Sequence, residues 1–186
     1  MASHHSGRYF EQMRRFAFLF LALAGLAVPA AALAAKDAPG DGTLVVQNGQ
    51  APDSGPDKAP VVSLKITGSV IGQLTGQGKI IIDGGAKSLP AEVTGPGVTR
   101  KDSAISDTAT VWAGGPDGFK FRAVGGTYTI LVYGTGVNLV AVGTGFVQLA
   151  GMPDWGKGDG RFSLNGDPFH SLPGTQTKQL VIGSNG

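Results

Sequence analysis

The sequence predicts an all-β fold, an antiparallel β-sandwich or a partly closed β-barrel meander, preceded by an N-terminal signal peptide. Three observations lead to this prediction. From Val61 onward, short β-branched and aromatic runs alternate with glycine clusters at intervals of about ten residues. Within the runs, apolar and polar residues alternate, as in strands that bury one face. No stretch of this region has the period of an amphipathic helix of useful length.

The N-terminal segment has the layout of a secretory signal. Arg14 and Arg15 precede an apolar run over residues 16–28, which ends at Pro29 and a series of alanines. Small residues at Ala32 and Ala34 predict a signal peptide over residues 1–34, with cleavage before residue 35 or one residue later. The alternative is an uncleaved anchor, because residues 16–35 form a 20-residue stretch without a charge. We expect a secreted, extracellular or cell-envelope protein that meets the membrane only transiently, through its signal segment.

Cysteine and charge narrow the class of protein further. The chain has no cysteine, which excludes both disulfides and a lipid-modified cysteine and favours a bacterial envelope. Arg8, Arg14, Arg15 and Glu11 lie in the signal segment, so the mature chain keeps twelve basic and twelve acidic residues. A neutral chain without a basic stripe is not expected to bind nucleic acid.

The mature chain is expected to hold a linker and one domain. Residues 35–60 are rich in Pro and Gly and include one short strand at 43–46, which could be an edge or closing strand. Residues 61–183 form the all-β domain. Its predicted strands cover residues 61–67, 69–75, 79–83, 109–113, 119–123, 127–133, 137–142, 146–150, 161–165 and 179–182.

Three glycine-framed units, GQGKIIIDG (76–84), GTGFVQLAG (143–151) and GDGRFSLNG (158–166), define the expected faces. Each G-x-G is interpreted as a hairpin turn or a bulge, where glycine adopts positive φ without steric cost. Period-2 alternation directs one set of side chains to the core: Ile80, Ile82, Val147, Leu149, Phe162 and Leu164. It directs another set to water: Lys79, Asp83, Gln148, Arg161, Ser163 and Asn165. Phe119 and Phe121, against Lys120 and Arg122, repeat the pattern.

Three segments carry a resemblance to a known kind of protein. They are GTYTILVYGTGVNLVAVGTGFVQLAG, GDGRFSLNGDPFHSLP and the final KQLVIG. Together they resemble small exported glycine-rich β-strand proteins of actinobacterial type, which are uncharacterised. The resemblance covers roughly residues 43 to 182 and implies no activity.

Common catalytic and cofactor motifs are missing from the sequence. No G-x-G continues as G-x-G-x-x-G, so no cofactor is predicted. His170 is the one histidine outside the signal segment, so neither a histidine-based metal cluster nor a catalytic set is predicted. Whether the protein is an enzyme stays open, with a non-catalytic role favoured; a small extracellular hydrolase would need His170 to meet an aspartate in a cleft.

The loop before residue 160 supplies the predicted ligand-binding residues, Asp154, Trp155, Lys157 and Asp159. An exposed indole in a polar loop could stack on a sugar ring, although the favoured interpretation of Trp155 is that its ring folds back and caps one end of the core. The first hypothesis is therefore a non-catalytic interaction or structural module. The alternative is a carbohydrate or cell-wall binding module that uses Trp155. The partner is unknown; a polysaccharide or another envelope protein would fit.

Overall fold

The computed structural model describes residues 40–50, 59–103, 106–151, 160–174, 177 and 179–183. The chain divides into two units, Met1–Ala34 and Ala35–Gly186, and all described residues belong to the second. Within these ranges no helix is present that is long and apolar enough to cross a membrane.

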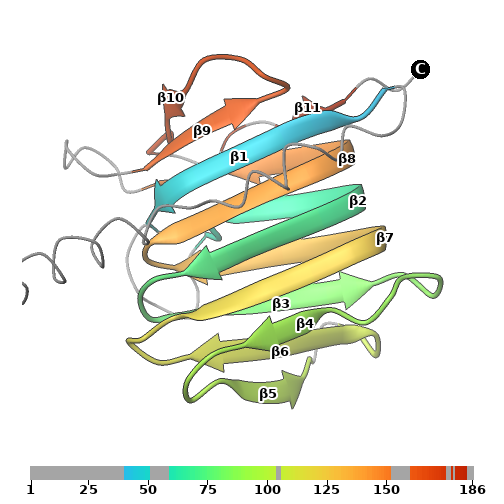
Figure 1. Cartoon of the computed structure of the whole chain (residues 1–186), viewed down its shortest axis with the longest axis vertical. Helices are drawn as coiled ribbons and strands as arrows, with labels where there is room; N and C mark the ends of the chain where they lie inside the picture. Colours follow the sequence, from blue (N-terminus) through green and yellow to red (C-terminus); the bar gives the residue numbers. More distant parts are fainter. Residues whose placement is uncertain are drawn as a thin grey trace, which may run out of the picture. The chain divides into compact units, whose positions relative to one another are not determined.

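The described residues form one antiparallel sheet of eleven strands and contain no helix (Figure 1). The strand order is β10-β9-β1-β8-β2-β7-β3-β6-β5, while β11 pairs with β8 and β4 pairs with β7. The strands are β1 (Gly42–Gly49), β2 (Val62–Leu74), β3 (Gly78–Gly84), β4 (Glu92–Thr94), β5 (Thr99–Asp102), β6 (Ala109–Gly114), β7 (Phe119–Gly134), β8 (Val137–Leu149), β9 (Arg161–Leu164), β10 (His170–Ser171) and β11 (Leu180–Ile182).

The all-β prediction is confirmed, but the sheet is neither a closed barrel nor a meander. In the sheet order, the only consecutive strands that pair are β5 with β6 and β9 with β10. The central strand β2 pairs with β7 on one side and β8 on the other, although both follow it by many residues. Most pairings are therefore long-range, which a pattern of local glycine turns does not reveal.

Three long strands replace six predicted short ones. β2, β7 and β8 each run through a glycine at which the sequence predicts a break. These glycines meet in register: Gly68 lies opposite both Gly126 and Gly143, and Gly143 lies opposite Gly42. We call these four residues the glycine row. A Cβ at Gly68 would lie 2.1 Å from the Val142 carbonyl oxygen, and one at Gly143 would lie 2.1 Å from that of Thr67. Only glycine permits this backbone approach.

The neighbours of the long strands change at the glycine row. On one side of the row, β7 pairs with β3 and β8 pairs with β11. On the other side, β7 pairs with β4 and β8 pairs with β1.

β1 lies inside the sheet, between β8 and β9, and not at its edge or as a closing strand. It is also longer than residues 43–46, and Leu44 and Val46 are buried.

Neither of the first two G-x-G units forms a hairpin. Gly76 lies in the connection from β2 to β3 and Gly78 is the first residue of β3; these two strands are separated by β7. Gly143 and Gly145 lie inside the continuous strand β8, where φ of Gly143 is +145°. In the third unit, Gly160 has a φ of +83° immediately before β9. Glycine here serves close strand approach and connections between non-adjacent strands more than tight turns.

One face of the sheet is buried. In β2 the side chains of Val62, Leu64, Ile66, Val70 and Leu74 alternate with exposed or half-buried ones, as period-2 geometry requires. The predicted core positions in β3 and β8 are confirmed: Ile80, Ile82, Val147 and Leu149 are buried. So are Phe119 and Phe121, while Lys120 and Arg122 are exposed. Burial of each such side chain stabilises the fold by roughly 1.5–3 kcal/mol.

Strand β9 follows the predicted faces only in part. Phe162 and Leu164 pack against the core but stay half-buried, because β9 lies near the end of the sheet. Ser163, predicted to face water, is instead buried. Its hydroxyl donates a 2.6 Å hydrogen bond to the carbonyl oxygen of Asp167, in the connection to β10. This bond satisfies the hydroxyl, so its burial carries no unpaired polar group.

Candidate functional site

The predicted ligand-binding residues Asp154, Trp155, Lys157 and Asp159 lie outside the described residues. Their role stays a prediction.

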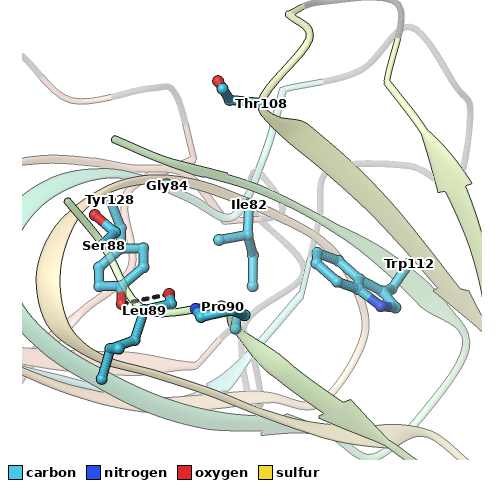
Figure 2. Close-up of a pocket in the computed structure, with 9 residues that line it drawn as sticks. Ile82, Gly84, Ser88, Leu89, Pro90, Thr108, Trp112 and Tyr128 are labelled. Atoms are coloured by element: carbon cyan, nitrogen blue, oxygen red, sulfur yellow. Dashed lines mark hydrogen bonds between the residues drawn. The ribbon is translucent and has the colours of Figure 1, made fainter. Parts of the chain in front are cut away.

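A pocket of about 140 Å³ lies where β3, β6 and β7 meet the segment that connects β3 to β4 (Figure 2). We call it the Trp112 pocket. Apolar side chains form most of its wall, and three hydroxyl-bearing residues complete it. The lining residues are Ile82, Gly84, Ser88, Leu89, Pro90, Ala91, Thr108, Trp112 and Tyr128.

Strand register places the indole in this wall. Trp112 lies opposite Ile80, and Thr110 lies opposite Ile82, so Trp112 shares the core-facing side of the sheet. β6 has only the short exposed strand β5 beyond it, and the indole stays half-buried. The Arg100 guanidinium carbon lies 5.9 Å from the centroid of the indole ring. This cation–π contact covers part of the ring and favours its orientation.

The opposite wall, residues 85–91, is fastened to β7 by side chains. Ser88 Oγ donates to the Thr127 carbonyl oxygen (2.8 Å) and accepts from the Thr127 N–H (3.0 Å). The Tyr128 hydroxyl lies 2.9 Å from the carbonyl oxygens of both Leu89 and Val124, to which it can donate (Figure 2). A Cβ at Gly126 would lie 2.6 Å from Ser88 Oγ, so the glycine lets this segment approach β7.

The third hydroxyl is also engaged. Thr108 Oγ1 donates to Asp83 Oδ1 at 2.5 Å, and Ser106 Oγ donates to Asp83 Oδ2 at 3.0 Å. Each hydroxyl in the pocket therefore has a protein acceptor, and none is paired with a histidine that could activate it as a nucleophile. The pocket offers apolar surface, not an activated group.

The rim of the pocket is apolar and accessible. Leu89 is 61% exposed. Figure 2 shows the Trp112 ring on one side of Ile82 and the Tyr128 ring on the other. Among the described residues, the indole N–H makes no hydrogen bond.

The residues named for a hydrolase do not assemble in the described part of the chain. His170 is exposed in β10, and its ring centroid lies 5.9 Å from that of Phe162. No described carboxylate forms a hydrogen bond or ion pair with it. Likewise, no group of three His, Cys, Asp or Glu residues that could hold a metal occurs among the described residues.

The two tyrosines of β7, Tyr128 and Tyr133, lie in or near the core. Tyr128 is buried, and its hydroxyl is hydrogen bonded as described above. Tyr133 is half-buried, with Lys79 Nζ 4.5 Å from its ring centroid. Partial burial raises the pKa of the Tyr133 hydroxyl, since desolvation disfavours the phenolate.

Sequence reasoning missed this pocket because its two walls are distant in sequence. It placed Trp112 in the predicted strand 109–113 and assigned it no role, whereas β6 continues to Gly114. A Trp in an edge-proximal strand and the Ser-Leu-Pro segment at 88–90 were the available signals. Nothing local indicates that they meet.

Comparisons of the chain with family models, with curated proteins and with solved structures found no match. The resemblance to exported actinobacterial β proteins therefore stays a prediction.

Proposed function

We propose that the protein is exported and acts, secreted or in the cell envelope, as a non-catalytic interaction module. In this proposal, the Trp112 pocket receives one compact apolar group, an aliphatic or aromatic side chain of a partner protein. The signal layout of residues 1–34 supports export.

The finer architecture we infer is a β-sandwich. The long central strands β2, β7 and β8 bury one face, and the described residues include no helix that could cover it. The long strands also change neighbours at the glycine row. A sheet that turns at this row and covers its own buried face would account for both observations.

The observation that carries the functional proposal is the engagement of the pocket hydroxyls. Ser88 and Tyr128 bond backbone carbonyls, and Thr108 bonds the Asp83 carboxylate. Such bonds hold the walls in place before a ligand arrives, which lowers the entropic cost of binding. Chemistry on a substrate would require a group left free to react.

The size of the pocket fits this occupant. An apolar cavity of about 150 Å³ is known to hold benzene. A volume of about 140 Å³ therefore matches one aromatic ring or one branched aliphatic side chain. Leu89 at the rim adds apolar surface for the residue that follows the anchor.

The test is a titration of the full-length protein with N-acetyl-phenylalanine amide, N-acetyl-leucine amide and N-acetyl-alanine amide. We expect the NMR signals of the Trp112 indole N–H and the Ile82 methyl groups to shift with the first two probes and not with the third. In Trp112→Ala the Ile82 methyl signals should no longer shift, since the substitution removes one wall of the pocket. The readout is specific to the site and needs no knowledge of the natural partner.

Ile71→Ala is the matched control. Ile71 is also apolar and 41% exposed, but it lies on the outer face of β2. The Ile71→Ala variant should keep the shifts of the unmodified protein. Equal responses to the alanine and phenylalanine probes, or unchanged binding in folded Trp112→Ala, would contradict the proposal.

A further inference from the structure

A second surface lies at the other end of the sheet, on the solvent-facing side of β1, β9 and β10. Gln47 and Ser171 both lie directly opposite Arg161, one on each neighbouring strand. Directly opposite residues of antiparallel strands project from the same face. Phe162, the next residue in β9, packs against the core, so Arg161 faces away from it. We call Gln47, Arg161, Ser171 and the nearby Phe169 the Arg161 row.

The Arg161 guanidinium is held on its edge and on its face. Its Nε donates a 2.7 Å hydrogen bond to Gln47 Oε1. Its central carbon lies 4.7 Å from the centroid of the Phe169 ring. These contacts reduce the conformational freedom that an exposed arginine would lose on binding a ligand.

Among the described residues, none forms a hydrogen bond or an ion pair with the Nη groups of Arg161. Arg161 is exposed, and no described carboxylate forms an ion pair with it, including Asp167 in the turn before Phe169. Its two Nη groups form a fork that matches the two oxygens of a carboxylate, with parallel N–H···O bonds. An arginine whose Nε is already used and whose fork is open is preorganised for an oxyanion.

The groups beside the fork favour a saccharide as the carrier of that oxyanion. Neighbouring strands lie about 4.8 Å apart. The Ser171 hydroxyl and the Gln47 amide therefore lie on either side of the Arg161 cation, and the three groups together span about 10 Å. Phe169 is 44% exposed and adds an apolar ring surface at the β10 side. Polar groups for hydroxyls, an aromatic surface and a carboxylate fork thus occur together.

We propose that the Arg161 row binds the carboxylate of an acidic saccharide, such as a hexuronate. This site is separate from the Trp112 pocket and does not depend on the function proposed for it.

The test is an NMR titration of the full-length protein with D-galacturonate, and in parallel with D-galactose and inorganic sulfate. Galacturonate should shift the Arg161 Nε–H and the Ser171 amide. Galactose lacks the carboxylate and should bind at least about tenfold more weakly, and sulfate lacks the ring and should also bind more weakly than galacturonate.

Two substitutions of Arg161 distinguish the contribution of its bidentate fork to binding from the contribution of its charge. Arg161→Gln should weaken galacturonate binding by about tenfold or more. Arg161→Lys keeps the charge but loses the bidentate fork, so binding should fall by about fivefold. Gln47→Ala, which leaves Arg161 itself intact, should weaken binding by about threefold because the guanidinium is no longer fixed.

Arg122→Gln is the control for net charge. Arg122 is an exposed arginine of β7, outside the Arg161 row, and its removal should leave galacturonate binding unchanged. Three results would overturn the proposal: equal binding of galactose, sulfate binding at least as tight as galacturonate, or an equal loss of binding in Arg122→Gln. Absence of any shift at Arg161 in the folded protein would overturn it as well.

Discussion

The Trp112 pocket and the Arg161 row use their polar groups in opposite ways. In the pocket, the hydroxyls of Ser88 and Tyr128 are bonded to backbone groups of the protein. In the row, one bond from Arg161 to Gln47 fixes the side chain and leaves the rest of the guanidinium open. The first arrangement builds a rigid apolar cavity, and the second builds an exposed cation of fixed orientation.

The difference shows that hydrogen bonds can prepare two kinds of recognition. A wall whose hydroxyls are already hydrogen bonded within the protein selects for shape and apolar surface, because little polar capacity is left over. A charged group held through one of its donors selects for a complementary charge. The pocket is built on β3, β6 and β7 and the row on β1, β9 and β10, so their contributions can be separated by substitution.

The largest effect is expected at the glycine row, which supports both regions. Gly143→Ala would place a Cβ 2.1 Å from the Thr67 carbonyl oxygen, at a φ of +145°. We expect a loss of about 3 kcal/mol or more in the free energy of unfolding, because backbone strain adds to a clash that cannot relax. Chemical denaturation followed by circular dichroism measures this loss.

Gly97→Ala serves as the control for backbone strain alone. Gly97 has a φ of +64°, but a Cβ there would meet nothing within 4 Å. The expected cost is about 1 kcal/mol. If the two variants lose equal stability, close packing at the glycine row is not the reason for its glycines.

A smaller effect, confined to the Trp112 pocket, is expected for Tyr128→Phe. The variant keeps the buried ring but removes the donor that faces the carbonyl oxygens of Leu89 and Val124. Leaving these acceptors without a partner should cost about 2 kcal/mol. Denaturant unfolding gives the cost, and hydrogen exchange of residues 85–91 should accelerate while exchange of β9 stays unchanged.

Tyr133→Phe is the matched control for Tyr128→Phe. Tyr133 lies in the same strand, and its hydroxyl makes no hydrogen bond to the described residues. Its removal should change stability little. A comparable loss in both variants would mean that the carbonyl bonds of Tyr128 do not hold the pocket wall.

Buried residues that follow a local alternation of apolar and polar side chains were predicted well from the sequence. Period-2 alternation located the buried residues of β3 and β8, since burial of one face constrains every second residue. The glycine positions were also informative, but the structural role of these glycines could not be predicted. Gly68, Gly126 and Gly143 act together only after strands distant in sequence have paired, so single glycines were read as breaks.

The sites were harder to predict for the same reason. Trp112 and residues 88–91 meet across β3 and β7, and Gln47 meets Arg161 although 114 positions separate them. Alternation places a side chain on a face but does not say which strand lies beside it. Strand order was the missing information, and both candidate sites are consequences of strand order.

The smallest effect is expected for Ser163→Ala. This substitution weakens the support of the Arg161 row and leaves the Trp112 pocket unchanged. Ser163 donates to the Asp167 carbonyl oxygen and so holds the turn that carries Phe169. Ser163→Ala removes this bond and should lower stability by about 1 kcal/mol. NMR should show a more mobile Phe169 ring and a weaker Nε–H signal from Arg161, while the Trp112 indole signal keeps its position.

Ser69→Ala provides the comparison, since Ser69 in β2 makes no side-chain hydrogen bond to the described residues and should lose little stability. The alternative is that Ser163 is buried only because β1 and β10 flank it. In that case Ser163→Ala would leave the Phe169 ring and the Arg161 signal unchanged. Phe169 would then keep its place without the Ser163 bond, and Gln47 and Phe169 would still orient the guanidinium together.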